Sequence, residues 1–150
     1  MAQARITVDD TRDRIRNGHP WIFGTQILKE EGDYAPGDIV QVFDKRRRPL
    51  GQGYINPASM IRIRLLTPLL EDRINKVFIT DRINAAWNYR LRMGHASSCR
   101  VVFGEADGLP GLVVDKFQDV DTKKSVLSVQ FLTLGTVSYT HLTLPTSDLV

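Results

Sequence analysis

Short apolar runs separated by turn-forming residues occupy about the first 65 positions of the chain. The runs are rich in β-branched residues, and Gly, Pro and Asn stand between them, which is typical of strands joined by tight turns. Five or six short strands at this spacing predict a small barrel or a twisted sheet. The apolar runs lie at residues 5–8, 21–23, 39–43, 50–55 and 61–65.

The hydrophobic period changes in the middle of the chain. Apolar side chains at Ile79, Ile83, Trp87 and Leu91 recur every four residues, and this stripe predicts an amphipathic helix. Gly94 follows as the expected helix stop. The opposite face of this helix is predicted to be polar and to carry Arg82, Asn84, Asn88, Arg90 and Arg92.

Strand-like runs return after about residue 100. Residues 104–111 contain three Gly and one Pro, and residues 121–124 are polar, so both segments are predicted as hairpin loops. The predicted fold class is α+β, with a small β-rich barrel, a connecting amphipathic helix and a partial antiparallel β-hairpin or meander domain. The expected strands lie at 100–103, 111–116 and 125–132, and the expected divisions are 1–70, 71–95 and 96–136.

The last fourteen residues do not continue this pattern. Translated back into codons, residues 137–146 resemble a sequencing-library adapter, and such a scar is not part of the native fold. We therefore expect 137–150 to be a non-native tail, with the natural gene continuing beyond about Gly135. The alternative is a genuine β-rich tail, because Val, Tyr, Thr and Leu suit strands.

Charge is distributed unevenly along the chain. The net charge of the 150 residues is +3, and 25% of the residues are charged. Residues 1–100 hold 17 Lys/Arg against 11 Asp/Glu, whereas residues 101–150 hold 3 against 6. A basic front part indicates an anionic partner for that part.

The cysteine content and the N-terminal residues give information on the cellular compartment of the protein. The single cysteine, Cys99, excludes an internal disulfide and a cysteine-based metal site. The N-terminus has no apolar core like that of a signal peptide, and no run of about 18 apolar residues could span a membrane. We therefore expect a cytoplasmic protein with no membrane partner.

Residues that could catalyse a reaction are few and poorly grouped. Glu105, Asp107 and Asp115 could suggest acid–base or Mg²⁺ chemistry, but a turn role for Asp107 and a strand-end cap for Asp115 are favoured. The three histidines lie far apart in the sequence, and Cys99 has no evident base. No phosphate-binding loop and no G-x-G-x-x-G motif appears. We expect no catalytic, cofactor-binding or metal-binding residue in this chain.

Nucleic-acid binding is better supported. Residues 45–48 place four cations at an expected hairpin tip, and the alternation of residues 61–65 places Arg62 and Arg64 on one solvent face. Cations on phosphates and exposed aromatic rings are the usual means of binding RNA. The alternatives are a solvated turn at 45–48 and core packing for Trp21 and Phe23. The predicted RNA-binding residues are Arg14, Arg16, His19, Lys45, Arg46, Arg47, Arg48, Arg62 and Arg64.

Several blocks of the chain together resemble a known family. Residues 19–66 are similar to the N-terminal PUA domain of class I SAM-dependent methyltransferases of the large-subunit rRNA cytosine-C5 type, and residues 104–115 resemble the G-E-x-D-G-L-P-G-L-x-x-D block of their central domain. Residues 129–135 resemble the strand that follows, while 121–125 looks like a small insertion. The blocks that carry the first likeness are His19-Pro20-Trp21-Ile22-Phe23, Pro36-Gly37-Asp38, Gly51-Gln52-Gly53-Tyr54-Ile55-Asn56-Pro57 and Ile61-Arg62-Ile63-Arg64-Leu65-Leu66.

The resemblance implies a function for the complete protein. Such an enzyme transfers a methyl group from S-adenosylmethionine to cytosine in 23S ribosomal RNA, and a cysteine adds to C6 of the base to activate C5. In the family, that cysteine and the methyl donor belong to a C-terminal Rossmann-like domain, which this sequence lacks, and Cys99 inherits no role. We therefore expect a fragment that binds ribosomal RNA weakly, binds no S-adenosylmethionine and methylates nothing. The full-length protein could form a homodimer.

Two other functions are compatible with the sequence. The chain could be a stand-alone RNA-binding accessory protein, which would require residues 137–150 to be genuine. It could also be a protein-interaction barrel that has no role with nucleic acids.

Overall fold

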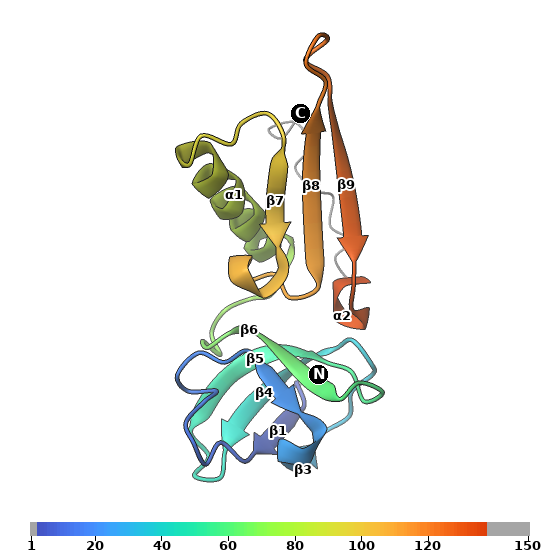
Figure 1. The fold of residues 1–150 in the computed structure, drawn as a ribbon. Coiled ribbons are helices and arrows are strands. Elements are labelled where there is room, and N and C mark those ends of the chain that lie inside the picture. The colour runs from blue at the N-terminus through green and yellow to red at the C-terminus, as the bar shows by residue number, and fades with distance from the viewer. Residues whose placement is uncertain (1–2, 138–150) are drawn as a thin grey trace. The chain divides into compact units, whose positions relative to one another are not determined.

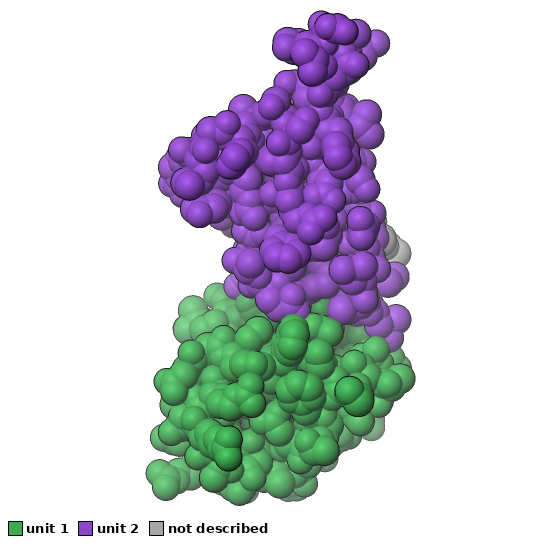
Figure 2. Space-filling model, in the orientation of Figure 1, with its two compact units in different colours: residues 1–72 green, residues 73–150 purple. Residues whose placement is uncertain are grey.

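The computed structural model describes residues 3–137 of the chain. The chain divides into two compact units, residues 1–72 and residues 73–150 (Figure 2). The expected adapter-derived tail, apart from Val137, lies outside the described residues. Each unit has its own sheet, and each is described separately below.

The first unit is a curled six-stranded sheet (Figure 1). The strands follow the order β2-β6-β5-β4-β1-β3, and all neighbours are antiparallel except β1 and β4, which are parallel. The mixed α+β class and the β-rich first part are therefore confirmed. The elements are β1 (Arg5–Val8), β2 (Trp21–Phe23), the 3₁₀ turn η1 (Gly24–Gln26), β3 (Ile27–Glu31), β4 (Ile39–Asp44), β5 (Pro49–Ile55) and β6 (Ile61–Thr67).

Alternation of side chains builds the core of this unit. Along β4, buried and half-buried residues alternate at every position, as expected for a strand with one face toward the core. The core side chains of neighbouring strands are fully buried, among them Ile6 of β1, Ile22 of β2, Val42 of β4 and Ile63 of β6. β-Branched residues suit these positions because they pack well on a pleated surface.

Strand β3 is the element that the sequence pattern missed. It occupies an outer edge of the sheet, where it pairs only with β1, and four of its five residues are exposed. An edge strand of this kind carries charged side chains, which discourage pairing with other chains. Ile27–Glu31 therefore lacks the apolar alternation by which the other strands can be recognised.

Two glycines allow β5 and β6 to approach closely. A Cβ atom on Gly53 would overlap the backbone carbonyl of Arg64, and one on Gly51 would overlap that of Thr67. Between them, the buried Gln52 donates hydrogen bonds to the carbonyls of Leu69 (2.9 Å) and Asp72 (2.7 Å). The Gly-Gln-Gly segment is thus a packing feature of the sheet.

The second unit contains a helix and a three-stranded antiparallel sheet in the order β7-β8-β9 (Figure 1). The side chain of Asn75 caps the start of α1 by accepting a hydrogen bond from the Phe78 amide. Gly94, with φ of 84°, follows the end of the helix as expected. The elements are α1 (Lys76–Arg92), β7 (Cys99–Phe103), the 3₁₀ turn η2 (Gly104–Asp107), β8 (Leu112–Gln118), β9 (Ser125–Phe131) and α2 (Leu134–Val137).

The predicted apolar stripe of α1 is buried except at its end. Ile79, Ile83 and Trp87 are buried, and Ala86 joins them. Leu91 is 41% exposed, so its predicted place in the buried stripe is wrong. It belongs to the last turn of the helix, next to the C-terminal stop.

Two arginines on the predicted polar face of α1 make contacts within the second unit. Arg82 donates a hydrogen bond to the carbonyl of Gly108, and Arg90 pairs with Asp107. Both partners belong to the glycine-rich segment 104–111, so the helix and this segment are joined by polar contacts. The turn role predicted for Asp107 is confirmed, because its carboxylate also accepts a hydrogen bond from the Phe103 amide at 2.7 Å.

Asp115 has a different role from the one predicted. It lies within β8, directly opposite Arg100 of β7, and accepts hydrogen bonds from the Arg100 guanidinium at 2.8 and 3.1 Å. The prediction of a strand-end cap is therefore wrong. Asp115 makes a cross-strand ion pair, a contact that sequence spacing does not reveal.

Candidate nucleic-acid interface

The tip between β4 and β5 is organised by one buried carboxylate. Asp44, the last residue of β4, is 7% exposed and accepts hydrogen bonds from the backbone amides of Arg46 (2.8 Å) and Arg48 (2.9 Å). It also accepts from the side chains of Arg48 (2.7 Å) and Arg16 (3.0 Å). Burial would raise the pKa of Asp44, but these hydrogen bonds from Arg48 and Arg46 outweigh it and hold the pKa below its usual range.

The four cations predicted at the tip are therefore not equivalent. Arg48 pairs with Asp44, and the ammonium of Lys45 lies 3.2 Å from the carboxylate of Asp9. Within the described part of the chain, Arg46 and Arg47 make no ion pair, and both are exposed. About half of the positive charge at the tip is thus available to an outside partner.

The loop from residue 9 to 20, between β1 and β2, presents further cations. Asp10 stabilises the loop because its carboxylate accepts hydrogen bonds from the amides of Ile15 and Arg16, both at 3.1 Å. Ile15 is buried in the core and anchors the loop. Arg12 and Arg14 lie in the loop between Asp10 and Ile15, and both are exposed.

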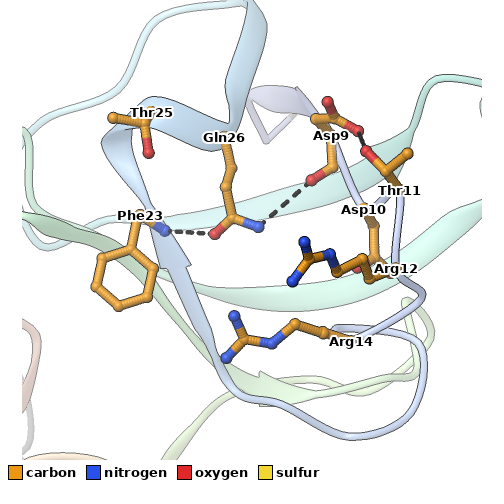
Figure 3. A pocket seen from close by; sticks show the side chains of 8 residues that line it. All are labelled: Asp9, Asp10, Thr11, Arg12, Arg14, Phe23, Thr25 and Gln26. Carbon is orange, nitrogen blue, oxygen red and sulfur yellow. Dashed lines mark hydrogen bonds between the residues drawn. The ribbon is translucent and has the colours of Figure 1, made fainter.

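Three neighbouring hollows lie along this surface. The first, of about 370 Å³, separates the loop from β2 and η1 and contains Arg12 and Arg14 (Figure 3). The second, also about 370 Å³, contains Arg16 and the tip cations, and the third, about 350 Å³, contains Arg47. The first two share Asp9, Asp10 and Thr11, and the last two share Lys45, so the hollows form one continuous surface, called the loop–tip surface below.

The structure brings six of the nine predicted RNA-binding residues to the loop–tip surface. The parallel pairing of β1 and β4 explains this, because the segments that follow both strands then leave the same end of the sheet. The six residues are Arg14, Arg16, Lys45, Arg46, Arg47 and Arg48.

The other three predicted residues lie outside these hollows, and two of them, His19 and Arg64, contact Trp21. The His19 ring meets the Trp21 ring edge-on at 6.0 Å, and the guanidinium of Arg64 lies 5.3 Å from the Trp21 ring centre. Arg62 is half-buried, and its Nε has no hydrogen-bond partner among the described residues. Arg62 and Arg64 flank the fully buried Ile63, so alternation places both on the face of β6 that points away from the core, where each is half-buried.

Sequence reasoning missed three cations of the loop–tip surface. Arg12 could have been found, because it alternates with Arg14 and Arg16. Arg5 lies 5.5 Å from the Phe43 ring centre, and Lys29 belongs to the unrecognised strand β3. Neither of the last two carries a local sequence signal.

Other kinds of site have less support in the described residues. No group of three or more His, Cys, Asp and Glu side chains within residues 3–137 could hold a metal ion. Burial raises the pKa of the Cys99 thiol, which disfavours the reactive thiolate. No helix in this part of the chain is long and apolar enough to cross a membrane.

Comparison with protein families shows what the first unit resembles. A family model described as a PUA-like domain matches residues 9–68, which cover all of the sheet except β1. Residues 9–68 are thus similar to a PUA-like domain. The loop–tip surface lies largely within this matched segment, since most of the residues that line it fall between positions 9 and 48.

Curated relatives extend the likeness beyond the PUA-like domain. The chain is 32% identical over 124 residues to a ribosomal RNA large subunit methyltransferase of Deinococcus radiodurans, covering 78% of this chain and 30% of the relative. It is 34% identical over 102 residues to ribosomal RNA large subunit methyltransferase I of Cronobacter sakazakii, covering 66% of this chain and 26% of the relative. The chain is homologous to ribosomal RNA large subunit methyltransferases, and it spans less than a third of the length of these relatives.

Solved structures share the fold. A SAM-dependent methyltransferase from Streptococcus mutans matches with a TM-score of 0.70 at 11% identity, covering 91% of this chain and 35% of that one. A methyltransferase complexed with SAH matches with the same TM-score and covers 94% of this chain and 35% of its own. At this identity the likeness concerns the fold alone.

Proposed function

We propose that this chain is the RNA-binding N-terminal part of a SAM-dependent methyltransferase that modifies C5 of a cytosine in 23S ribosomal RNA. The homology to ribosomal RNA large subunit methyltransferases supports the enzyme class, and the PUA-like domain supports binding of RNA. The loop–tip surface carries the proposal within this chain. It gathers cations from two segments far apart in the sequence, and several of them have no acidic partner among the described residues.

The loop–tip cations would bind RNA mainly through phosphates. Arg46 and Arg47 are exposed and make no ion pair in the described part of the chain, so they can neutralise phosphates without first breaking a salt bridge. Arg16, Lys45 and Arg48 already hold Asp44 and Asp9, and their main role is to shape the surface. Each phosphate contact releases counterions, so binding should weaken steeply with salt.

The described residues do not fit S-adenosylmethionine. Nucleotide cofactors bind at the carboxyl ends of parallel strands that are followed by helices. The only parallel pair described in the chain, β1 and β4, leads into a loop and a tight turn, and the sheet of the second unit is antiparallel. In this proposal the methyl donor and the catalytic cysteine belong to a further domain, and Cys99 has no part in catalysis.

Paired charge substitutions test the RNA-binding role. Arg46→Gln/Arg47→Gln removes the two unpaired tip cations, and Lys123→Gln/Lys124→Gln removes the same charge from the exposed β8–β9 turn of the second unit. We expect the first pair to weaken binding of a 23S rRNA transcript and to reduce the slope of log K against log salt by about 1.4 to 1.8. The lysine pair should leave both quantities close to wild type.

Two results would contradict the proposal. Equal effects of the two double variants would mean that the loop–tip surface is not the binding surface. Sequencing of the source locus beyond codon 136 tests the enzymatic part. A frame that does not continue into a domain with a glycine-rich cofactor loop would remove methyl transfer from the proposal.

A further inference from the structure

The first hollow of the loop–tip surface has an aromatic wall as well as cations. In Figure 3, Arg12 and Arg14 extend from the loop toward the side of the hollow that carries Phe23. Phe23 is half-buried and is one of the residues that line the hollow. Thr25 lies on the same side, is exposed and adds a hydroxyl group.

The wall of this hollow is held in place by Gln26. Its side-chain oxygen accepts a hydrogen bond from the Phe23 amide at 2.9 Å, and its nitrogen donates to the carbonyl of Asp9 at 3.3 Å (Figure 3). The backbone amide of Asp9 donates in turn to the carbonyl of Gln26 at 2.8 Å. The side that carries Phe23 and the side that carries the arginines are thereby joined before any ligand arrives.

The two carboxylates that line the hollow already have hydrogen-bond or ion-pair partners. Asp9 accepts a hydrogen bond from Thr11 and pairs with Lys45, and these contacts hold its pKa below the usual range. Asp10 accepts from two backbone amides of its own loop. Arg12 and Arg14, in contrast, make no ion pair within residues 3–137. The hollow therefore offers two uncompensated guanidinium groups beside an aromatic ring.

We infer that this hollow binds one unpaired nucleotide of an RNA strand, with its phosphate on Arg12 and Arg14 and its base against Phe23. The inference rests on the proposed RNA-binding function and assigns it a subsite for single strands. The volume of about 370 Å³ lies within the range of small-ligand pockets. An aromatic side chain stacks on a base that has left the helical stack. A base that is paired within a duplex stays in the stack and could not reach the ring of Phe23.

The test compares a single strand with a duplex. The full chain is titrated with a fluorescein-labelled decauridylate strand and with a blunt RNA duplex of the same length, and binding is followed by fluorescence anisotropy. Phe23→Leu keeps an apolar side chain but removes the ring. We expect it to weaken binding of the single strand about tenfold and to leave duplex binding within twofold of wild type.

A second variant leaves the half-buried Phe23 unchanged. Arg12 and Arg14 are both exposed, so Arg12→Gln/Arg14→Gln should fold normally even if Phe23→Leu does not. We expect this pair to weaken single-strand binding and to reduce its salt slope by about 1.4, because two phosphate contacts are lost. An unchanged salt slope would overturn the inference.

The outcomes separate this subsite from the proposed function. If Phe23→Leu binds the single strand as well as wild type, the nucleotide subsite is wrong while RNA binding stands. If the wild-type chain binds neither RNA, both proposals fail. If Phe23→Leu folds and weakens strand and duplex equally, the ring has no selective role and the subsite is again wrong.

Discussion

Arg90 of α1 and Asp107 of η2 form a two-pronged ion pair, with N–O distances of 2.5 and 2.8 Å. Their side chains are only 15% and 11% exposed, so the pair is largely removed from water. The carboxylate of Asp107 also accepts a hydrogen bond from the Phe103 amide. The Arg90 guanidinium also donates a hydrogen bond to the Arg100 carbonyl at 3.0 Å. The pair therefore fixes the helix to the first hairpin of the second unit at several points.

Loss of one partner of this pair should destabilise the second unit. Asp107→Asn leaves the Arg90 charge largely buried without its counter-ion, and we expect a loss of about 2–4 kcal/mol in the free energy of unfolding. Arg100→Gln breaks the Arg100–Asp115 pair, in which the arginine is 48% exposed, and should cost less than about 1 kcal/mol. Urea unfolding followed by tryptophan fluorescence measures both, and similar losses for the two variants would contradict this account.

Gly53 should tolerate no side chain. A Cβ atom there would overlap the carbonyl of Arg64 on the neighbouring strand, so Gly53→Ala must separate β5 from β6. We expect a loss of about 3 kcal/mol or more, as for other overpacked or strained buried sites. Gly18→Ala is the matched control, because its φ of 99° is strained but no atom lies within 4 Å of the added Cβ. Thermal unfolding should show the larger fall in Tm for Gly53→Ala.

Asp44 should make the first unit sensitive to acid. Its pKa in the folded protein is below the usual range, because the hydrogen bonds from Arg48 and Arg46 outweigh the effect of burial. A depressed pKa contributes stability that is fully present above the unfolded value of about 3.9 and is lost as the pH falls through the folded value. The difference in unfolding free energy between wild type and Asp44→Asn should therefore be largest near pH 7 and shrink below about pH 4. A difference that is constant with pH would contradict this role.

Cys99 should react slowly with thiol reagents. Burial raises the pKa of its thiol, and the nearby Arg90 and Lys116 only partly oppose this effect. We expect its reaction with a disulfide reagent at pH 8 to be several-fold slower than that of a free thiol and to speed up when the chain is unfolded. A folded chain that reacts faster than the unfolded one would instead indicate an activated thiol.

Much of the fold follows from local patterns in the sequence. The β-branched apolar run at residues 39–43 predicts β4, and the four-residue spacing from Ile79 to Trp87 predicts α1, because β-branched residues suit strands and this spacing results from burying one face of a helix. The same reasoning places Lys45–Arg48 at a hairpin tip. These features depend on neighbours along the chain, which a single sequence displays.

The features that were missed depend on contacts between distant segments. The pairing of Arg16 and Arg48 with Asp44 decides which tip cations remain available, yet nothing in the spacing of these residues predicts it. Arg62 is half-buried and its guanidinium lies against Gly24, a contact that alternation alone does not predict. Sequence pattern therefore located most of the cations, and three-dimensional pairing determined what each of them does.

The parallel pairing of β1 with β4 has a consequence for how the loop–tip surface comes into being. β1 can complete its pairing only after β4 has been made, since it lies between β4 and β3. An unfolded or partly synthesised chain holds the same arginines but not their arrangement. Any RNA that recognises the arrangement will bind the native state alone and will raise its stability by mass action. Ligand binding and completion of the sheet are thus linked equilibria, and each can be measured through the other.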